Sequence, residues 1–293
     1  MAESSNLHLA FEADDTGGTI LRVQQQQPPW RVLRGFRNAS GETLAHVHNV
    51  SGGILDTDSL SWQVDVGPRA QAQITSTGAT RVYRSRSPDR RASQRLHVNV
   101  AADAYLEYLP DQLIPFAGSR FDQTARVEIE RGGSLIWCDR VAPGREASDE
   151  IFRFVELTSH FELIADGQLA VTERWTLAPL TQRLDSIARL GVFRHFASCY
   201  ICKAGEPASY WKNFEAQMQP VADRVSGSEG FRSSEVTRSS EVIWGVTSLR
   251  AQGLVIRGLA VSGRSLASGL VEIWKAAKWL LSGRVATLPR KVH

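Results

Sequence analysis

Apolar and polar residues alternate along most of the chain from its start to about Trp175. The run Leu60–Val66 changes character at every step and stops at Gly67-Pro68, and the same period of two recurs at Leu96–Val100 and Ala125–Ile129. Alternation at every second residue is typical of a half-buried β-strand, and Gly/Pro pairs are typical of the turns that end one. Short strands separated by turns, with no helical period between them, predict an all-β body.

A β-hairpin is the strongest short-range β signal. Phe161–Ala165 and Gln168–Trp175 flank the two-residue turn Asp166-Gly167, a dipeptide suited to the backbone of a tight hairpin. No stretch recurs at a fixed length along the chain, so a regular propeller or solenoid is not indicated.

Helical periods appear only late in the sequence. From Pro207, a residue favoured in a first helical turn, apolar side chains recur three and four residues apart at Trp211, Phe214, Met218 and Val221. Pro220 is expected to kink or end this helix. A second helix is predicted from Ser265 as N-cap to Gly283 as stop. Its Trp279 and Leu280 widen the apolar stripe, for packing on the β body or for docking another protein.

These patterns predict one domain over residues 1–293. The β body is expected at 7–205 and 240–263, and the helical elements at about 207–225 and 265–283. Residues 226–240 are rich in Ser, Gly, Glu and Arg, which predicts a mobile loop.

Composition excludes several classes of protein. A net charge of +3 over 293 residues does not by itself require a nucleic acid or a membrane surface as partner. The polar N-terminus has no apolar core of a signal peptide, and no run approaches the ~20 apolar residues of a spanning helix. Three cysteines argue against a disulfide scaffold and predict a cytoplasmic protein.

Cys199 and Cys202 form a CxxC, with His195 just upstream. On a helix or tight turn this spacing could bind metal or act in redox chemistry. Residues 192–201 have the pattern of a strand instead, in which positions three apart point to opposite faces and cannot chelate one ion. His46 and His48 share one face of a predicted strand and could hold nickel with further ligands, but their pattern favours ordinary surface or capping histidines.

A run of arginines extends from Arg81 to Arg95. It lacks the interleaved aromatics of a single-strand nucleic-acid binder, Tyr83 excepted, so it favours a solvated loop or a face for an acidic partner protein. The chain contains no nucleophile elbow, P-loop or dinucleotide fingerprint.

Three acids lie on strand faces that otherwise have the pattern of a core. Asp58 precedes Leu60 by one strand period, Asp139 follows Trp137, and Glu173 lies between Val171 and Trp175. Because burying a bare carboxylate is very costly, each must find a partner, a cation or water. Together they indicate a polar, water-accessible passage inside the β body.

Four motifs occur in a fixed order along the chain. His-x-x-Ser-Gly-Gly holds Gly52 and Gly53, Thr-Gly-Ala-Thr-x-x-Tyr-Arg-Ser holds Gly78, Tyr83 and Arg84, Leu-Glu-Tyr-Leu-Pro-Asp holds Pro110, and the last pair is Gly144-Arg145. With Gly253–Arg257 and Pro289-Arg290 near the end, this ordered set resembles the UreD/UreH family of urease accessory proteins.

The resemblance implies a mostly β fold, with a right-handed β-helical body and a few α-helices in the C-terminal third. It implies no catalysis but a nickel-insertion chaperone in a protein complex, which joins the accessory proteins UreF (directly) and UreG (through UreF) to apo-urease. No cofactor is expected to be tightly bound, and nickel(II) would bind only transiently. Asp58, Asp139 and Glu173 match acidic positions associated in this family with an internal nickel route.

Two alternatives come from other classes of protein. A β-helical carbohydrate-active enzyme would use paired carboxylates such as Asp56 and Asp58. An RNA-binding module would use the Arg81–Arg95 run and would bind with a steep salt dependence. The absence of a leader in the sequence disfavours the first, and the absence of a nucleic-acid motif disfavours the second.

Overall fold

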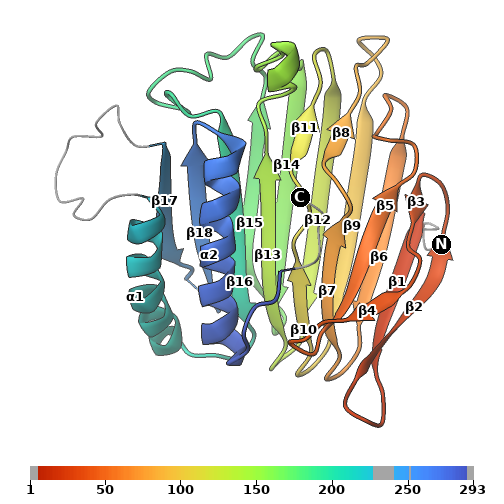
Figure 1. Cartoon of the computed structure of the whole chain (residues 1–293), viewed down its shortest axis with the longest axis vertical. Helices are drawn as coiled ribbons and strands as arrows, with labels where there is room; N and C mark the ends of the chain where they lie inside the picture. The colour runs from red at the N-terminus through yellow and green to blue at the C-terminus, as the bar shows by residue number, and fades with distance from the viewer. Residues whose placement is uncertain (1–5, 227–240, 251, 289–293) are drawn as a thin grey trace.

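Two β-sheets stacked face to face form the body of the protein (Figure 1). The computed structural model describes residues 6–226, 241–250 and 252–288. The seven-stranded sheet consists, in spatial order, of β15 (Gln168–Leu177), β14 (Glu156–Ala165), β12 (Arg120–Ile129), β9 (Ala92–Val100), β6 (Ser59–Val66), β1 (Leu7–Ala13) and β2 (Thr19–Gln26). The main path of the eleven-stranded sheet is β17 (Val242–Ser248), β18 (Gly253–Ala260), β16 (His195–Lys203), β13 (Ser134–Val141), β10 (Tyr105–Tyr108), β7 (Gln71–Ser76), β5 (Thr43–Asn49) and β3 (Trp30–Arg31). The short strands β4 (Gly35–Arg37), β8 (Thr80–Val82) and β11 (Leu113–Pro115) attach to this second sheet.

The long strands from β5 to β14 pass back and forth between the two sheets. As a result, β6, β9, β12 and β14 are parallel neighbours in one sheet, and β5, β7, β10 and β13 are parallel neighbours in the other. The outer strands pair antiparallel, as β14 does with β15 and β16 does with β18. The mostly β fold with late helices is therefore confirmed. The right-handed β-helical body is not confirmed, because both sheets are mixed and the strands do not form a regular solenoid.

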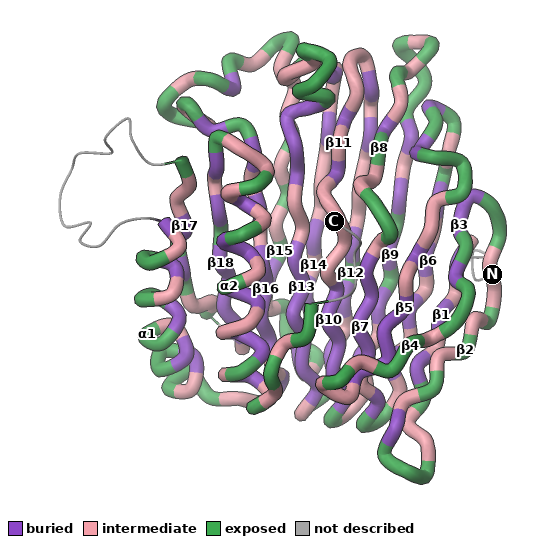
Figure 2. The backbone as a smooth tube through the Cα atoms, in the orientation of Figure 1, coloured by how far each residue is buried: buried purple, intermediate pink, exposed green. Residues whose placement is uncertain are grey.

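The main hydrophobic core fills the space between the sheets. Alternate residues of each strand point into it, among them Val64 of β6, Val98 of β9 and Leu135 of β13. Figure 2 shows this burial along the strands, whereas exposed positions gather at the connecting loops. The period of two seen in the sequence is therefore the alternation between this core and the outer faces.

The hairpin predicted at Asp166-Gly167 is confirmed. β14 and β15 pair antiparallel across it, and both turn residues have positive φ, 50° and 73°. A backbone of this kind twists in the sense that the flanking strands require.

Two α-helices cover the outer face of the eleven-stranded sheet near β16 and β18 (Figure 1). They are α1 (Ala208–Val225) and α2 (Gly263–Ser282), and they close a second core that includes Trp211, Trp244 and Trp274. Trp279 remains 56% exposed, whereas Leu280 packs against this core.

The bounds of both helices agree closely with expectation, and one cap differs. α1 continues past Pro220 to Val225, so this proline does not end the helix. The N-cap of α2 is Ser262 rather than Ser265, because the Ser262 side chain accepts the hydrogen bond from the Ser265 backbone N–H at 3.1 Å. Gly283 ends the helix as predicted, with a φ of 66°. The expected loop at 226–240 lies, apart from Ser226, outside the described residues.

A buried charge cluster fixes α2 to the sheet. The fully buried Nζ of Lys278 lies 3.0 Å from a carboxylate oxygen of Glu42 and 3.0 Å from one of Glu107 on β10. Tyr105 donates to Glu107 at 2.6 Å, and Arg284 approaches Glu42 at 3.5 Å. Buried charges persist only where paired and hydrogen-bonded in this way, so the cluster defines one position for the helix.

The cysteines correct one expectation. Cys138 of β13 and Cys199 of β16 are directly opposite in the antiparallel pair and form a disulfide, which the low cysteine count did not predict. The strand assignment of the CxxC is confirmed: Cys199 faces the helices, whereas Cys202 is buried in the core between the sheets. Within the described ranges, neither helix is both long and apolar enough to span a membrane.

Candidate polar cavity between the sheets

A row of polar residues crosses the inner face of the seven-stranded sheet. Gln94 of β9, Gln123 of β12 and Ser159 of β14 are in register on adjacent parallel strands. Each occupies an inward position, one strand period before the apolar residues Leu96, Ala125 and Phe161. Ser198 of β16 and Asp139 of β13 are also in register and approach this row from the other sheet.

These side chains line a cavity of about 50 Å³ between the sheets. A neighbouring cavity of about 190 Å³ shares Thr80, Gln94, Tyr108 and Pro110 with it and continues towards Gly52, Gly53 and Gly78. Spaces of this size with polar walls have room for water or a small cation. The interior is thus polar and hollow along one side of an otherwise apolar core.

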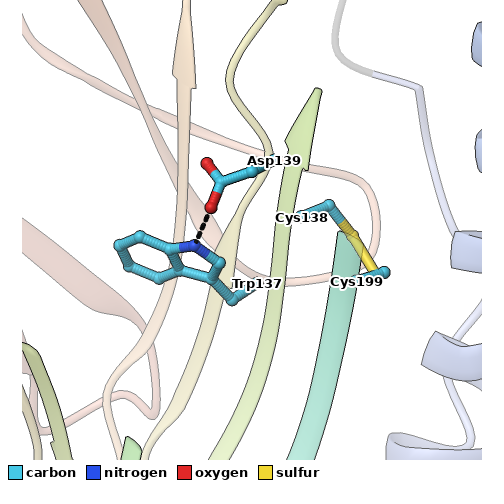
Figure 3. The surroundings of a disulfide bond; sticks show 4 residues. All are labelled: Trp137, Cys138, Asp139 and Cys199. Carbon is cyan, nitrogen blue, oxygen red and sulfur yellow. Dashed lines mark hydrogen bonds between the residues drawn. A yellow bond between two sulfur atoms is a disulfide. The ribbon is translucent and has the colours of Figure 1, made fainter. Parts of the chain in front are cut away.

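Two carboxylates line this space, Asp111 and Asp139. Asp111 pairs with Arg140 at 3.2 Å, whereas no salt bridge is found for Asp139 among the described residues. The indole Nε1 of Trp137 donates a hydrogen bond to it at 2.7 Å, and Figure 3 shows both residues on one side of β13 with the Cys138–Cys199 disulfide on the other. Burial among protein atoms raises the pKa of Asp139 to about 6, against the lowering effect of the Trp137 hydrogen bond, and the nearby charge of Glu173 raises it further. Near pH 6 this group is therefore poised between its charged and neutral forms.

Glu173 lies beside Asp139 at the margin of the cavity. It accepts a hydrogen bond from the hydroxyl of Tyr200 at 2.7 Å and forms an ion pair with Arg257 of β18. Tyr200 itself lines the cavity, and its pKa is raised by burial and by the Glu173 charge. Glu173 on β15, the edge strand of the seven-stranded sheet, and Arg257 on β18 of the other sheet therefore form an ion pair that joins the two sheets beside the cavity.

Asp58 does not join these two acids. Its carboxylate accepts a hydrogen bond from the backbone N–H of Leu55 at 2.9 Å, within the turn before β6, and it lines neither cavity. The structure brings Asp139 and Glu173 together and leaves Asp58 at a separate turn.

Asp56, two residues earlier, forms ion pairs with two arginines. Its side chain is 2% exposed and lies 3.0 Å from Arg86 and 3.8 Å from Arg90. The Arg86 hydrogen bonds hold the pKa of Asp56 below its ordinary value. A glycosidase acid needs a raised pKa, so Asp56 does not have the properties of the catalytic acid.

The histidine pair faces away from both cavities. Ala45 and Val47 of β5 point into the core between the sheets, so His46 and His48 lie on the opposite face, where the His46 ring meets Phe36 at 5.8 Å. Among the described residues, no group of three or more His, Cys, Asp or Glu is arranged to hold a metal ion. Any cation in the cavity would therefore be held by few ligands.

The motif residues fall into two neighbouring groups. Gly52, Gly53, Gly78 and Pro110 line the larger cavity. Tyr83, Arg84 and Arg145 line a surface hollow with Phe116. A side chain at Gly53 would collide with the Tyr83 ring and the Arg81 carbonyl, which explains glycine there and joins the two groups. Gly144, with φ of 135°, allows the Glu150 carbonyl to approach.

Within the described residues, half of the arginine run is paired with carboxylates. Arg86 and Arg90 pair with Asp56, and Arg91 pairs with Asp122 and Glu156. These pairs interrupt the track of free cations that an RNA backbone needs.

Sequence reasoning missed Gln94, Gln123 and Ser159. The signal was available, because extending the period of two backwards from Leu96, Ala125 and Phe161 reaches them as it reaches Asp58 from Leu60. What the sequence could not show is that β9, β12 and β14 are neighbours in register.

Comparison with known proteins identifies the class to which this fold and cavity belong. The family model described as UreD urease accessory protein matches residues 3–293, so the chain belongs to the UreD family. It is 36% identical to urease accessory protein UreD of Herpetosiphon aurantiacus, over 94% of this chain and 92% of that protein. It is 32% identical to urease accessory protein UreD 2 of Pseudomonas syringae pv. tomato, over 91% and 87% of the two chains. With UreD of Opitutus terrae, identity is 31% over 71% of this chain and 77% of that one.

Proposed function

We propose that this chain is a non-catalytic scaffold for urease maturation in the cytoplasm. It joins UreF, and UreG through UreF, to apo-urease, and it passes nickel(II) to the urease active site through the polar cavity between its sheets. The observation that carries the proposal is the part-buried carboxylate of Asp139, with its raised pKa, at a polar cavity of about 50 Å³ inside a member of the UreD family.

The donor set suits an ion in transit. Asp139 supplies one anionic oxygen, with Glu173 beside it, whereas Gln94, Gln123 and Ser159 supply neutral oxygens across the cavity. Nickel bound by few oxygen ligands exchanges readily, whereas a closed set of histidines and cysteines would retain it. The residues that line the cavity therefore favour passage of nickel over its storage.

The raised pKa of Asp139 also supports transient binding of a cation. A carboxylate with a pKa near 6 is ionised at neutral pH, and an approaching divalent cation favours that charged form. Departure of the cation leaves an anion that is costly to bury, so proton uptake can accompany release. Asp139 would then alternate between holding a cation and holding a proton.

The scaffold role is tested by complex formation and activation. Purified chain is mixed with the cognate UreF, UreG and apo-urease at micromolar concentration, and the complex is followed by gel filtration. We expect the chain to elute with UreF and to increase the urease activity obtained at fixed nickel. Separate elution of the chain and UreF, or equal activation without the chain, would contradict the proposal.

A further inference from the structure

We propose that the surface hollow around Tyr83 and Phe116 docks an acidic segment of a partner protein that carries a large apolar side chain. This inference rests on the proposed function, because the partners in its test are those proposed above. It adds the location and chemistry of one contact.

The floor of the hollow is aromatic. The rings of Tyr83 and Phe116 meet edge to face, with centroids 5.1 Å apart, and the Arg145 guanidinium lies 4.3 Å from the Phe116 centroid. Leu180 forms part of the wall and is 66% exposed. An aromatic floor with an exposed aliphatic wall matches the centre of a protein interface, where a buried apolar anchor contributes most.

The apolar surface continues along the loop between β15 and β16. Leu180 also lines a second hollow formed by residues of that loop, so the two hollows are continuous. The same loop exposes 98% of Ile187 and 63% of Val192. Several exposed apolar side chains beside one hollow mark a contact surface more strongly than scattered single residues do.

The charged residues around the two hollows favour an acidic segment as the bound partner. The two hollows are lined by four arginines and two carboxylates. Arg145 pairs with Glu150, and Arg183 pairs with Asp185, whereas Arg84 has no ion pair within the described parts of the chain. Arg153 pairs with Asp149 at 3.4 Å, in a pair open to solvent, and its charge also acts on Glu150. The guanidinium of Arg84 and the exposed guanidinium of Arg153 favour carboxylates on the partner.

The position of the hollow links docking to the cavity. Tyr83 fills the space where a side chain at Gly53 would lie, and Gly52 and Gly53 line the larger interior cavity. A partner seated on Tyr83 and Phe116 therefore lies beside that end of the interior space. This placement suits a protein that supplies nickel to the cavity or receives nickel from it.

The test compares matched charge reversals in the full-length chain. Arg84→Glu changes the rim, and Tyr83→Ala changes the floor. Arg174→Glu is the control, because Arg174 is exposed on β15, points to the opposite face of the strand from Glu173 and lines neither hollow. Circular dichroism and thermal melting establish that each variant is folded. Binding to cognate UreF and to apo-urease is then measured separately by biolayer interferometry.

We expect Arg84→Glu to weaken binding of one of these two partners by about tenfold or more, with Arg174→Glu within about twofold of the native chain. Tyr83→Ala should weaken the same partner. Native-like binding of both partners by Arg84→Glu would overturn the inference and leave the proposed function standing, as would an equal loss with Arg174→Glu. If the native chain binds neither partner, the proposed function fails too. Self-association lost on Arg84→Glu would instead assign the hollow to a second copy.

Discussion

The indole nitrogen of Trp137 lies 2.7 Å from a carboxylate oxygen of Asp139, two positions further along the same strand. Both residues point between the sheets, so the hydrogen bond holds the carboxylate towards the cavity. A single neutral donor offsets only part of the cost of burial, which explains why the pKa of Asp139 remains raised. The protein thus keeps a costly group at the position where the proposed function needs it.

The first prediction concerns the stability cost of Asp139. Its pKa is raised from 3.8 to about 6 on folding, so the folded state binds the proton more tightly than the unfolded state. Stability is therefore highest below about pH 4 for this group and is lost as pH rises through 6. Two pKa units correspond to about 3 kcal/mol, so Asp139→Asn, which keeps an acceptor for Trp137, should stabilise the protein by up to that amount at pH 7.5.

Urea unfolding of Asp139→Asn and of the native chain at pH 4.5 and 7.5 measures this difference. The gain should be clear at pH 7.5 and small at pH 4.5. An equal gain at both values would show that ionisation of Asp139 is not its source.

The second prediction concerns the cluster that positions α2. Lys278→Met removes the only fully buried cation of the described residues and leaves Glu42 and Glu107 without it. Loss of one partner from a buried ion pair typically costs 3–5 kcal/mol, so a loss of about that size is expected. Lys275→Met, on an exposed side of the same helix, is the matched control.

Guanidinium unfolding measures both variants. Adding Glu107→Gln to Lys278→Met should recover part of the loss, because an uncompensated buried charge is removed. A loss of less than about 1 kcal/mol for Lys278→Met would contradict this account of the cluster.

The third prediction concerns the cysteines. Denaturation without a reductant should leave Cys138 and Cys199 protected from iodoacetamide and expose only Cys202, as read by peptide mass spectrometry. The bridge closes a loop with a sequence separation of 61, for which the chain-entropy relation gives about 4 kcal/mol of stabilisation. Cys138→Ala should therefore lower the free energy of unfolding by a few kcal/mol. Alkylation of all three cysteines in the oxidised protein would contradict the disulfide.

Local features of the fold could be predicted from the sequence because local interactions determine them. The Asp166-Gly167 hairpin and the Gly283 stop depend on residues within a few positions of each other. The N-cap of α2 was misplaced from Ser262 to Ser265 because several serines and glycines precede the helix and offer competing caps. α1 runs to Val225, as expected from the sequence, because its buried face, including Phe214 and Met218, holds the helix together around Pro220.

The cavity could be predicted only in part, since it depends on strand pairing over long sequence separations. Asp139 and Glu173 were placed correctly on inward faces, whereas Asp58 satisfies its carboxylate locally at the turn before β6. The register that aligns Gln94 with Gln123, and Cys138 with Cys199, is set by the pairing of whole strands. A pattern within one strand shows which face a residue occupies, but not which residue lies beside it.

The most direct test of the nickel route is the rate at which apo-urease acquires nickel in the assembled complex. Nickel bound per urease active site is measured over time by mass spectrometry of the isolated urease, with native chain, Asp139→Asn or Asp58→Asn. We predict that Asp139→Asn retains UreF binding but slows nickel loading by about tenfold or more, whereas Asp58→Asn stays within about twofold of native. Loading at the native rate with Asp139→Asn would contradict passage of nickel by way of this carboxylate.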